Sequence, residues 1–467
     1  MSSGRPNIIF IMADDHAAHA MSCYGSYRNS TPNLDRIADE GMRLDNCFCT
    51  NSICTPSRAA ILTGKYPHMN GVITFNALSA NQVTFPQLLR TSGYYTAMVG
   101  KWHLDCEPTG FDHWNVVPGQ GKYHDPDFID NGVERTIDGY VTDIITDLTL
   151  DVLQERPKDR PFCILSQHKA PHDMWESDDK HAAMFADLDI PEPETLFDDY
   201  ASRATAVQQS TQRIGAARPG HTLFEAETGQ ITDPTARKRA QYQEYMKRYL
   251  RCVASIDDNV GRILDYLDDN DLTENTIIIY TSDQGFFLGE HGWYDKRFMY
   301  EESLRMPFVV RYPDEIPAGT VDDHIILNTD FAATLLDYAG LKPAASMQSE
   351  SFRPILNGED PGDWRTIMYY RYYRSHFNTP SHWGVRTKQY KYIYYNMSME
   401  HELYDLSEDA SEVTNVYRDP KYGEVARHLR SEVSRLQKEL GDTDDSFQGE
   451  IRALELLRQP HHPIFRL

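Results

Sequence analysis

The chain has 467 residues, seven cysteines and a net charge of −24, and 40% of its residues are hydrophobic. This length predicts one large domain with a smaller appended unit, and the composition excludes an intrinsically disordered chain. The acidic balance disfavours broad electrostatic binding to nucleic acid or anionic membranes, so an anionic substrate would require a local concentration of positive charge.

The N-terminal sequence indicates where the protein acts. Its longest clean apolar run, residues 8–13, is too short to span a bilayer and has no charged segment or cleavage site before it. As the sequence is written we expect a cytoplasmic protein, or a periplasmic or secreted one if an N-terminal segment was removed. The odd number of cysteines makes a disulfide framework the weaker interpretation.

Strand and helix patterns alternate along the first 365 residues. "PNIIFIMADD" predicts a buried strand that ends at Asp14 and Asp15, and "TPNLDRIADEG" predicts a helix that ends at its Gly. Further strands are expected at 94–100, 161–168, 276–283 and 307–312, and further helices at 140–155, 237–269 and 330–339. This alternation predicts an α/β fold with a large, mostly parallel sheet sandwiched by helices.

The pattern changes after about residue 365. Short aromatic runs at 366–373 and 382–395 predict a small antiparallel sheet, and 422–440 predicts an amphipathic closing helix. We therefore expect a catalytic α/β domain at 1–365 and a C-terminal α+β subdomain at 366–467. Residues 170–235 have no clear strand pattern and are expected to form a long excursion over one face.

Carboxylates follow two of the predicted strands. Asp14 and Asp15 follow the first strand, and Asp283 and Gln284 follow a later one. Neighbouring carboxylates repel unless a cation lies among them, and an all-oxygen set suits Ca²⁺, with Mg²⁺ as the alternative. Each Asp could instead cap a helix or turn, but two such pairs at strand ends favour the metal site.

Basic side chains also follow the predicted strand ends. They are Lys101, His103, His168, His172, His291 and Lys296. A single exposed Lys is usually a solvated charge, and a single His is usually structural. Their recurrence beyond strand ends favours an anion site, and Lys101 and His103 would point to the same side if the extended backbone continued.

"CTPSRAAILTG" predicts a short helix with Pro56 in its first turn, Thr55 or Ser57 near its cap, and Gly64 at its end. Cys54 would lie at its N-terminus, where the helix dipole lowers a thiol pKa, and Arg58 would lie one turn later. Residue chemistry alone leaves two interpretations, a reactive thiolate or a metal site with two nearby cysteines. The second is the weaker because the cysteine spacing lacks the paired pattern of zinc sites.

The same stretch matches the C-x-P-S-R signature of the sulfatase family, in the alkaline-phosphatase-like superfamily. Further segments resemble family blocks in the expected order: "PNIIFIMADD", "TPNLDRIADEGMRLDNCF", "GKWHL", "HKAPH", "TSDQGFFLGEHGWYDKR" and "HELYDL". The chain thus resembles a type I sulfatase, a sulfuric ester hydrolase that converts a sulfate ester to an alcohol and inorganic sulfate. In this family the signature Cys is oxidised to formylglycine, which implies a formylglycine-generating enzyme as a maturation partner.

The resemblance also implies a role for each matching residue. One Ca²⁺ would be held by Asp14, Asp15, Asp283, Gln284 and an oxygen of the modified Cys54. Arg58 and Lys101 would orient the aldehyde hydrate, Lys101, His172 and Lys296 would contact sulfate, and His103 would hydrogen-bond the hydrate. Gln284 departs from the family, in which Asn or His is common. As general acid we favour His172 over Lys296 because imidazole titrates nearer neutral pH.

Three loop stretches suggest a carbohydrate substrate. Residues 108–128, 190–203 and 295–313 are similar to bacterial sulfatases of the N-acetylglucosamine-6-sulfatase and glycosaminoglycan sulfatase type. The excursion loops offer further groups to a sugar, namely His124 from the first of these stretches and Asp173, Trp175, His291 and Trp293 from elsewhere in the chain, and we single out His291, Trp175 and Asp173 as candidate substrate-binding residues. Ordinary loop packing is an equal alternative for them, and the position of the sulfate stays open.

Four alternatives remain at this point. One is a phosphonate or phosphate diester hydrolase of the same superfamily, and another is an arylsulfatase or choline-type sulfatase. A non-enzyme alternative is a sulfate-binding protein with an unmodified Cys54. A thiol-redox role for Cys47, Cys49 and Cys54 would leave the Asp pairs unexplained. The oligomeric state is open.

Overall fold

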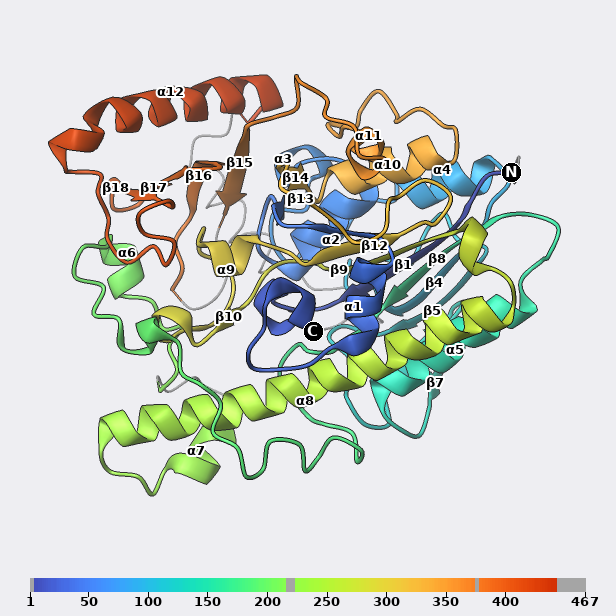
Figure 1. Ribbon diagram of the computed structural model, residues 1–467, viewed down its shortest axis with the longest axis horizontal. Helices are drawn as coiled ribbons and strands as arrows, with labels where there is room; N and C mark the ends of the chain where they lie inside the picture. The colour runs from blue at the N-terminus through green and yellow to red at the C-terminus, as the bar shows by residue number, and fades with distance from the viewer. Residues whose placement is uncertain (1–3, 216–222, 374–377, 443–467) are drawn as a thin grey trace.

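The computed structural model describes residues 4–215, 223–373 and 378–442 (Figure 1). Its main feature is a ten-stranded sheet. The strands lie in the order β13 (Thr320–Asp322), β2 (Met42–Leu44), β12 (Phe308–Arg311), β9 (Thr276–Ser282), β1 (Asn7–Ala13), β8 (Phe162–Gln167), β4 (Tyr95–Lys101), β5 (His113–Val117), β6 (Asp127–Asp130) and β7 (Val133–Thr136).

The centre of this sheet is parallel. β1 pairs in parallel with β8 and β9, and β4 pairs in parallel with β5 and β8, whereas β12 and β6 join this core in antiparallel orientation. Every residue of β1 is buried, as expected for a strand covered on both faces. The mostly parallel sheet predicted from the sequence is therefore confirmed.

Helices cover both faces of the sheet. Ile9 and Ile11 of β1 belong to a hydrophobic cluster with α1 (Pro32–Asp39), α5 (Val141–Glu155) and α8 (Pro234–Asp269). Ile8 and Phe10 point the other way, into a cluster with α2 (Cys54–Thr63), α4 (Phe85–Thr91) and α10 (Asp330–Tyr338). Alternate residues of one strand thus serve two cores, and Figure 1 shows the long α8 running across one side with α5 beside it.

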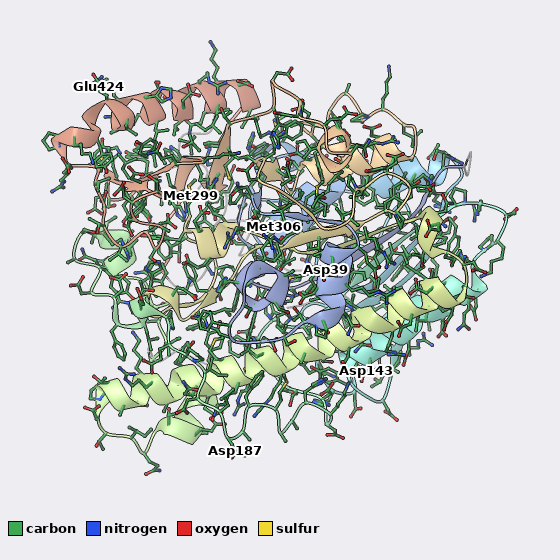
Figure 2. The ribbon with its side chains drawn as sticks, viewed as in Figure 1. Asp39, Asp143, Asp187, Met299, Met306 and Glu424 are labelled. Carbon is green, nitrogen blue, oxygen red and sulfur yellow. The ribbon has the colours of Figure 1, made fainter. Side chains whose placement is uncertain are left out.

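The C-terminal part forms the predicted small sheet and closing helix. β15 (Ile367–Tyr372), β16 (His382–Thr387), β17 (Tyr390–Tyr395) and β18 (Glu400–Asp405) form an antiparallel meander, over which α12 (Gly423–Leu440) lies (Figure 1). The buried Ala426, Leu429, Val433 and Leu436 of α12 recur at helical spacing. Glu424 lies at the outer end of this helix, whereas Met299 and Met306 are buried in the interior (Figure 2).

The meander and α12 share a hydrophobic cluster with Ile53 and Cys54 at the start of α2. The C-terminal part is therefore packed directly against the segment with the signature Cys. A boundary at residue 365 stays a prediction, and residues 443–467 of the expected subdomain lie outside the described residues.

Short elements complete the described chain. They are η1 (Ala18–Ala20), η2 (Ser22–Tyr24), β3 (Cys47–Phe48), α3 (Pro67–Asn70), η3 (Glu194–Phe197), α6 (Thr205–Gln208), α7 (Leu223–Thr228), η4 (Thr273–Asn275), β10 (Phe287–Leu288), η5 (Glu290–Gly292), β11 (Tyr294–Asp295), α9 (Glu301–Leu304), β14 (Ile326–Leu327), α11 (Arg353–Leu356) and η6 (Pro420–Tyr422). The described residues of 170–235 contain no strand, as expected for an excursion. No described helix is long and apolar enough to cross a membrane.

Candidate active site

The carboxyl ends of the central parallel strands meet at one edge of the sheet. Asp14 and Asp15 follow β1, Asp283 follows β9, and Lys101 ends β4. The backbone N–H of Asp283 donates to Ala13 O over 3.3 Å, which continues the β1–β9 pairing to the carboxylates. Parallel pairing therefore gathers side chains that lie far apart in the sequence, as predicted.

Helix α2 points its N-terminus at this edge. It begins at Cys54, which places Pro56 in its first turn as expected, and it ends at Gly64, which adopts a φ of 61° in the left-handed region. The hydroxyl of Ser57 donates to the main-chain carbonyl of Asp283 and accepts from Asn328 Nδ2 over 2.8 Å. These contacts fix the first turn of α2 against the end of β9.

Arg58 connects the ends of four parallel strands, which are β9, β1, β4 and β8. Its Nε lies 3.0 Å from Asp283 Oδ2 and its Nη2 lies 3.1 Å from Asp14 Oδ2. Its Nη1 donates to Lys101 O over 2.6 Å and to Gln167 Oε1 over 2.8 Å. The guanidinium is 1% exposed, so these partners replace the water it has lost. Gln167 was not predicted as a site residue. Its position as a polar residue at the end of the apolar strand β8 could have indicated that it faces the site.

Asp15 is the centre of a second group of contacts. Lys296 Nζ lies 2.5 Å from its Oδ1 and 2.6 Å from its Oδ2, and Gln284 Nε2 donates to Oδ1 over 2.5 Å. His172 Nε2 lies 3.7 Å from Oδ2, and the backbone N–H of Asp15 donates to Asp283 Oδ1 over 3.2 Å. The residues singled out beyond three separate strands therefore face one another.

Lys101 lies between Asp14 and Gln120. Its Nζ forms an ion pair with Asp14 Oδ2 and donates to Gln120 Oε1. Gln120 stands between Gly119 and Gly121, which have φ angles of 55° and 69°. Glycines favour this left-handed conformation, so the Gly-Gln-Gly sequence was the signal for a tight turn that presents a side chain.

The three carboxyl groups respond differently to burial. Burial disfavours the charged form of Asp14, but the nearby Lys101 and His172 outweigh it and hold its pKa well below the usual value. Burial raises the pKa of Asp15 to about 6 against the opposing charge of Lys296. Burial also raises the pKa of Asp283 to about 6, with Asp14 adding to the effect. Three carboxylates crowded in this way would be stabilised by a further cation.

The thiol of Cys54 does not behave as expected for a helix N-terminus. Burial raises its pKa to about 12, and the neighbouring Asp14 adds to the effect although Lys101 opposes it. The expectation of a dipole-lowered pKa is therefore wrong, because desolvation outweighs the dipole. Cys47 and Cys49 lie in a different hydrophobic cluster from Cys54, and all seven cysteines are free thiols, so the thiolate-metal and redox interpretations gain no support.

His103 enters the site through a turn. Its φ of 51° shows that the extended backbone does not continue past Lys101, so the simple same-side argument does not apply. The imidazole is nevertheless 5% exposed, and neither ring nitrogen has a hydrogen-bond partner among the described residues. Burial lowers its pKa well below the usual value, with Lys101 adding to the effect, so the fold favours the neutral imidazole.

The oxygen atoms of the site fit a hard divalent cation. Carboxylate oxygens of Asp14 and Asp15 and a ring nitrogen of His172 lie within 4.8 Å of one another, and Asp283 Oδ1 accepts from the main-chain N–H of Asp15. Asp14 Oδ1 and Gln284 Oε1 are buried and have no hydrogen-bond partner among the described residues. Carboxylate and amide oxygens are the ligands Ca²⁺ prefers, so the side chains present match the expected ion.

The candidate substrate-binding residues have different surroundings. Trp175 is buried and packs on Tyr245 with ring centroids 4.8 Å apart. His291 is buried, and its Nδ1 lies 2.9 Å from Asp198 Oδ2. Asp173 is half-buried, and its Oδ1 lies 2.8 Å from His172 Nδ1. A role in binding the substrate stays a prediction for each.

Comparisons with known proteins agree with this geometry. The family model described as Sulfatase matches residues 6–341, and one described as N-sulphoglucosamine sulphohydrolase, C-terminal, matches residues 289–439. The chain is 42% identical to the N-acetylglucosamine-6-O-sulfatase of Bacteroides thetaiotaomicron, with 97% of this chain and 90% of the relative covered.

Solved structures of similar proteins share the fold. One protein in complex with its substrate, D-glucosamine-2-N,6-O-disulfate, matches with a TM-score of 0.91 at 41% identity, over 95% of this chain and 99% of its own. The phosphonate monoester hydrolase of Silicibacter pomeroyi matches with a TM-score of 0.75 over 93% of this chain and 95% of its own. At 19% identity the latter likeness concerns the fold alone.

Proposed function

Since this chain belongs to the sulfatase family and is a sulfuric ester hydrolase, we propose that it removes the 6-O-sulfate from a glucosamine residue. The observation that carries the proposal is the convergence of Arg58, Lys101 and Lys296 on buried carboxylates beside Cys54. The substrate class is supported by the names of the relatives, an N-acetylglucosamine-6-O-sulfatase and a protein solved with a glucosamine disulfate.

Cys54 is the proposed position of the nucleophile. A formylglycine-generating enzyme would oxidise it before folding, when the thiol that the fold buries is still accessible. A formylglycine hydrate at this position would supply an oxygen nucleophile toward sulfur, a role for which the thiol with its raised pKa is poorly suited. The anchored first turn of α2 keeps this position beside the carboxylates.

Asp14, Asp15, Asp283 and Gln284 would hold the family's Ca²⁺. A bound Ca²⁺ supplies Lewis-acid polarisation of oxygen and a positive charge that favours the deprotonated nucleophile. Of the protein's own groups, Arg58 keeps Asp14 and Asp283 in place, because its guanidinium contacts both. Gln284 is held by its amide N–H to Asp15, which leaves its Oε1 for the ion.

Lys101 and Lys296 would bind the transferred sulfate group. Lys296 keeps its charge, because Asp15 and Asp295 overcome the effect of burial and raise its pKa. Preorganised charges of this kind stabilise the negative oxygens of the transition state, and removing one usually costs about 10²- to 10³-fold in rate.

Two histidines would move the protons. His172 presents Nε2 toward Asp15 and would give its proton to the oxygen of the leaving alcohol, since a sugar alkoxide is a poor leaving group. The neutral His103 has free ring nitrogens within the described part and would accept a proton from the nucleophile's hydroxyl. A neutral imidazole can perform this step, whereas a protonated one cannot.

A screen of defined sulfated mono- and disaccharides, with detection of free sulfate, tests the proposal. We expect turnover of 6-O-sulfated glucosamines and no turnover by the Cys54→Ala variant, which should fold normally. Failure to release sulfate from any 6-O-sulfated glucosamine would refute the substrate class. Full activity of Cys54→Ala would refute the assigned nucleophile.

Two controls separate the alternatives. A mass measurement of the peptide with Cys54 should show conversion of the thiol to the aldehyde, and an unmodified thiol would favour a binding protein. Aryl sulfate and aryl phosphonate are compared at equal concentration. A larger kcat/KM for the phosphonate would favour a phosphonate hydrolase.

A further inference from the structure

Two buried side chains hold the main chain at His172 and Asp173. The hydroxyl of Tyr123 donates to the carbonyl oxygen of His172 over 2.5 Å, and Lys169 Nζ donates to that of Asp173 over 3.1 Å. Lys169 Nζ also lies 4.5 Å from the centroid of the Tyr123 ring. The two side chains are each 3% exposed. Tyr123 and Lys169 therefore contact each other and together hold the main-chain carbonyls of His172 and Asp173. We call this pair the support of His172.

This support acts on the orientation of the imidazole. His172 Nδ1 lies 2.8 Å from both the carbonyl oxygen and the Oδ1 of Asp173. Both atoms are acceptors, so Nδ1 carries a hydrogen and Nε2 is the nitrogen that exchanges a proton with a ligand. Nε2 points toward the carboxylates and lies 3.7 Å from Asp15 Oδ2. Any shift of the Asp173 main chain would turn this ring.

Burying a lysine costs folding free energy unless its ammonium group makes hydrogen bonds or other polar contacts that replace those to water. Lys169 contacts the ring of Tyr123 and the carbonyl of Asp173, which also accepts from His172. A Met at this position would fill similar space but leave the carbonyl with one donor fewer. The ammonium group therefore restrains the acceptor that orients His172.

We propose that Lys169 and Tyr123 are positioning residues that aim His172 Nε2 at the leaving oxygen of the substrate. The inference rests on the proposed function, in which His172 protonates the leaving alcohol. Neither side chain touches the reacting atoms in this account. Both act through the main chain of His172 and Asp173.

Leaving-group dependence distinguishes this role from a general structural one. The alcohol that leaves glucosamine 6-sulfate needs a proton from a general acid, because a sugar alkoxide is unstable. The 4-nitrophenolate that leaves 4-nitrophenyl sulfate is stable and needs little protonation. We expect Lys169→Met to lower kcat/KM about 10- to 100-fold on the sugar sulfate and less than about 3-fold on the aryl sulfate. Tyr123→Phe, which keeps the ring beneath Lys169, should show the same selectivity with a smaller loss.

Lys122→Met is the matched control. It makes the same substitution next to Tyr123, but the Lys122 side chain is 66% exposed and pairs with Asp127 at the surface. It should leave both activities unchanged. Equal losses on the two substrates in Lys169→Met and Tyr123→Phe, or no loss on the sugar sulfate, would overturn the inference.

A second readout does not depend on activity. Long-range ¹H–¹⁵N NMR of ¹⁵N-histidine protein observes the hydrogen on Nδ1 of His172, with His172→Asn used to assign its signals. We expect this hydrogen, which is held by Asp173 in the wild type, to exchange with solvent faster in Lys169→Met, and an unchanged exchange rate would overturn the inference. If the wild-type protein cleaves neither sulfate, the proposed function fails while this measurement still tests the positioning.

Discussion

Arg58 Nε lies 3.0 Å from Asp283 Oδ2, and both side chains are completely enclosed by protein. This pair joins α2, one turn after Cys54, to the residue that follows β9. It places the helix that begins at Cys54 in contact with the central parallel strands, so the stability of the fold and the geometry of the site depend on the same interaction.

Arg58→Gln should therefore cost both stability and activity. The change removes the ion-pair partner of the buried Asp283 and leaves Asp14 with Lys101 alone, and breaking a buried pair in this way typically destabilises a protein by about 3–5 kcal/mol. Urea unfolding measures the loss, and free-sulfate release measures activity. Arg135→Gln is the control, because Arg135 is 45% exposed and pairs with Asp130 at the surface, so its loss should cost less than about 1 kcal/mol. Similar losses in both variants would contradict the role given to Arg58.

Lys296→Met and His172→Asn should affect substrates differently. Lys296 stays charged because Asp15 raises its pKa, so its loss removes sulfate binding and should lower kcat/KM about 10²- to 10³-fold on both sugar and aryl sulfates. His172→Asn should lower kcat/KM much more on the sugar sulfate than on the aryl sulfate, because only the sugar alcohol needs a proton to leave. If Lys296→Met were the selective variant instead, Lys296 would be the general acid.

Removal of Ca²⁺ should lower activity and stability together. The three crowded carboxylates would be stabilised by a cation beyond Arg58, Lys101 and Lys296, and a ligand that binds only the folded protein stabilises it by about 2.7 kcal/mol at 100 times its Kd. Treatment with a chelator should lower both the melting temperature and sulfate release, and Ca²⁺ should restore them better than Mg²⁺. Unchanged melting and activity after complete metal removal, checked by elemental analysis, would contradict a calcium site.

Gln284→Leu tests the least typical ligand. It removes the buried Oε1 and the amide N–H that contacts Asp15 while keeping similar volume. We expect the Ca²⁺ concentration for half-maximal activity to rise about 10-fold or more. Gln284→Asn, which restores an amide one methylene shorter, should recover part of the loss. An unchanged calcium requirement in Gln284→Leu would remove this residue from the ligand set.

Buried histidines should make the protein sensitive to acid. Burial lowers the pKa of His16 to about 3 and the pKa values of His168 and His382 to about 4. The unfolded chain binds these protons near pH 6.5 and the folded protein does not, so stability is full above about pH 6.5 and falls as pH drops toward 4.

The His168→Phe variant measures how much His168 contributes to the loss of stability at low pH. Between pH 6 and 4.5 it should reduce the slope of unfolding free energy against pH by up to about 1.4 kcal/mol per pH unit, the value for one proton. Urea midpoints across this range provide the measurement. An unchanged slope would show that His168 is protonated in the folded state.

The sequence predicted the sheet and the site because both depend on local patterns. Apolar runs that end in Asp14, Lys101 and Asp283 indicate parallel strands, and parallel strands present their carboxyl ends at one edge. The cap of α2 differs from the prediction, because the extended Ile53 forms the N-cap in place of Thr55 or Ser57.

Other parts of the site depend on neighbours distant in the chain. Gln167, Gln120 and Lys169 gave weak local signals, and their roles come from the side chains they meet. The pKa of Cys54 was misjudged for the same reason, since the helix dipole is local whereas desolvation is set by packing from remote segments.

The sequence by itself determined which chemical groups the protein has and which strand ends they follow, since hydrophobic periodicity and turn residues act over a few positions. Only the tertiary structure decided that Arg58 serves four strand ends, that His103 enters through a turn, and that Lys169 lies behind His172. Burial and pairing arise from contacts between segments hundreds of residues apart, and these contacts set the electrostatics of the site.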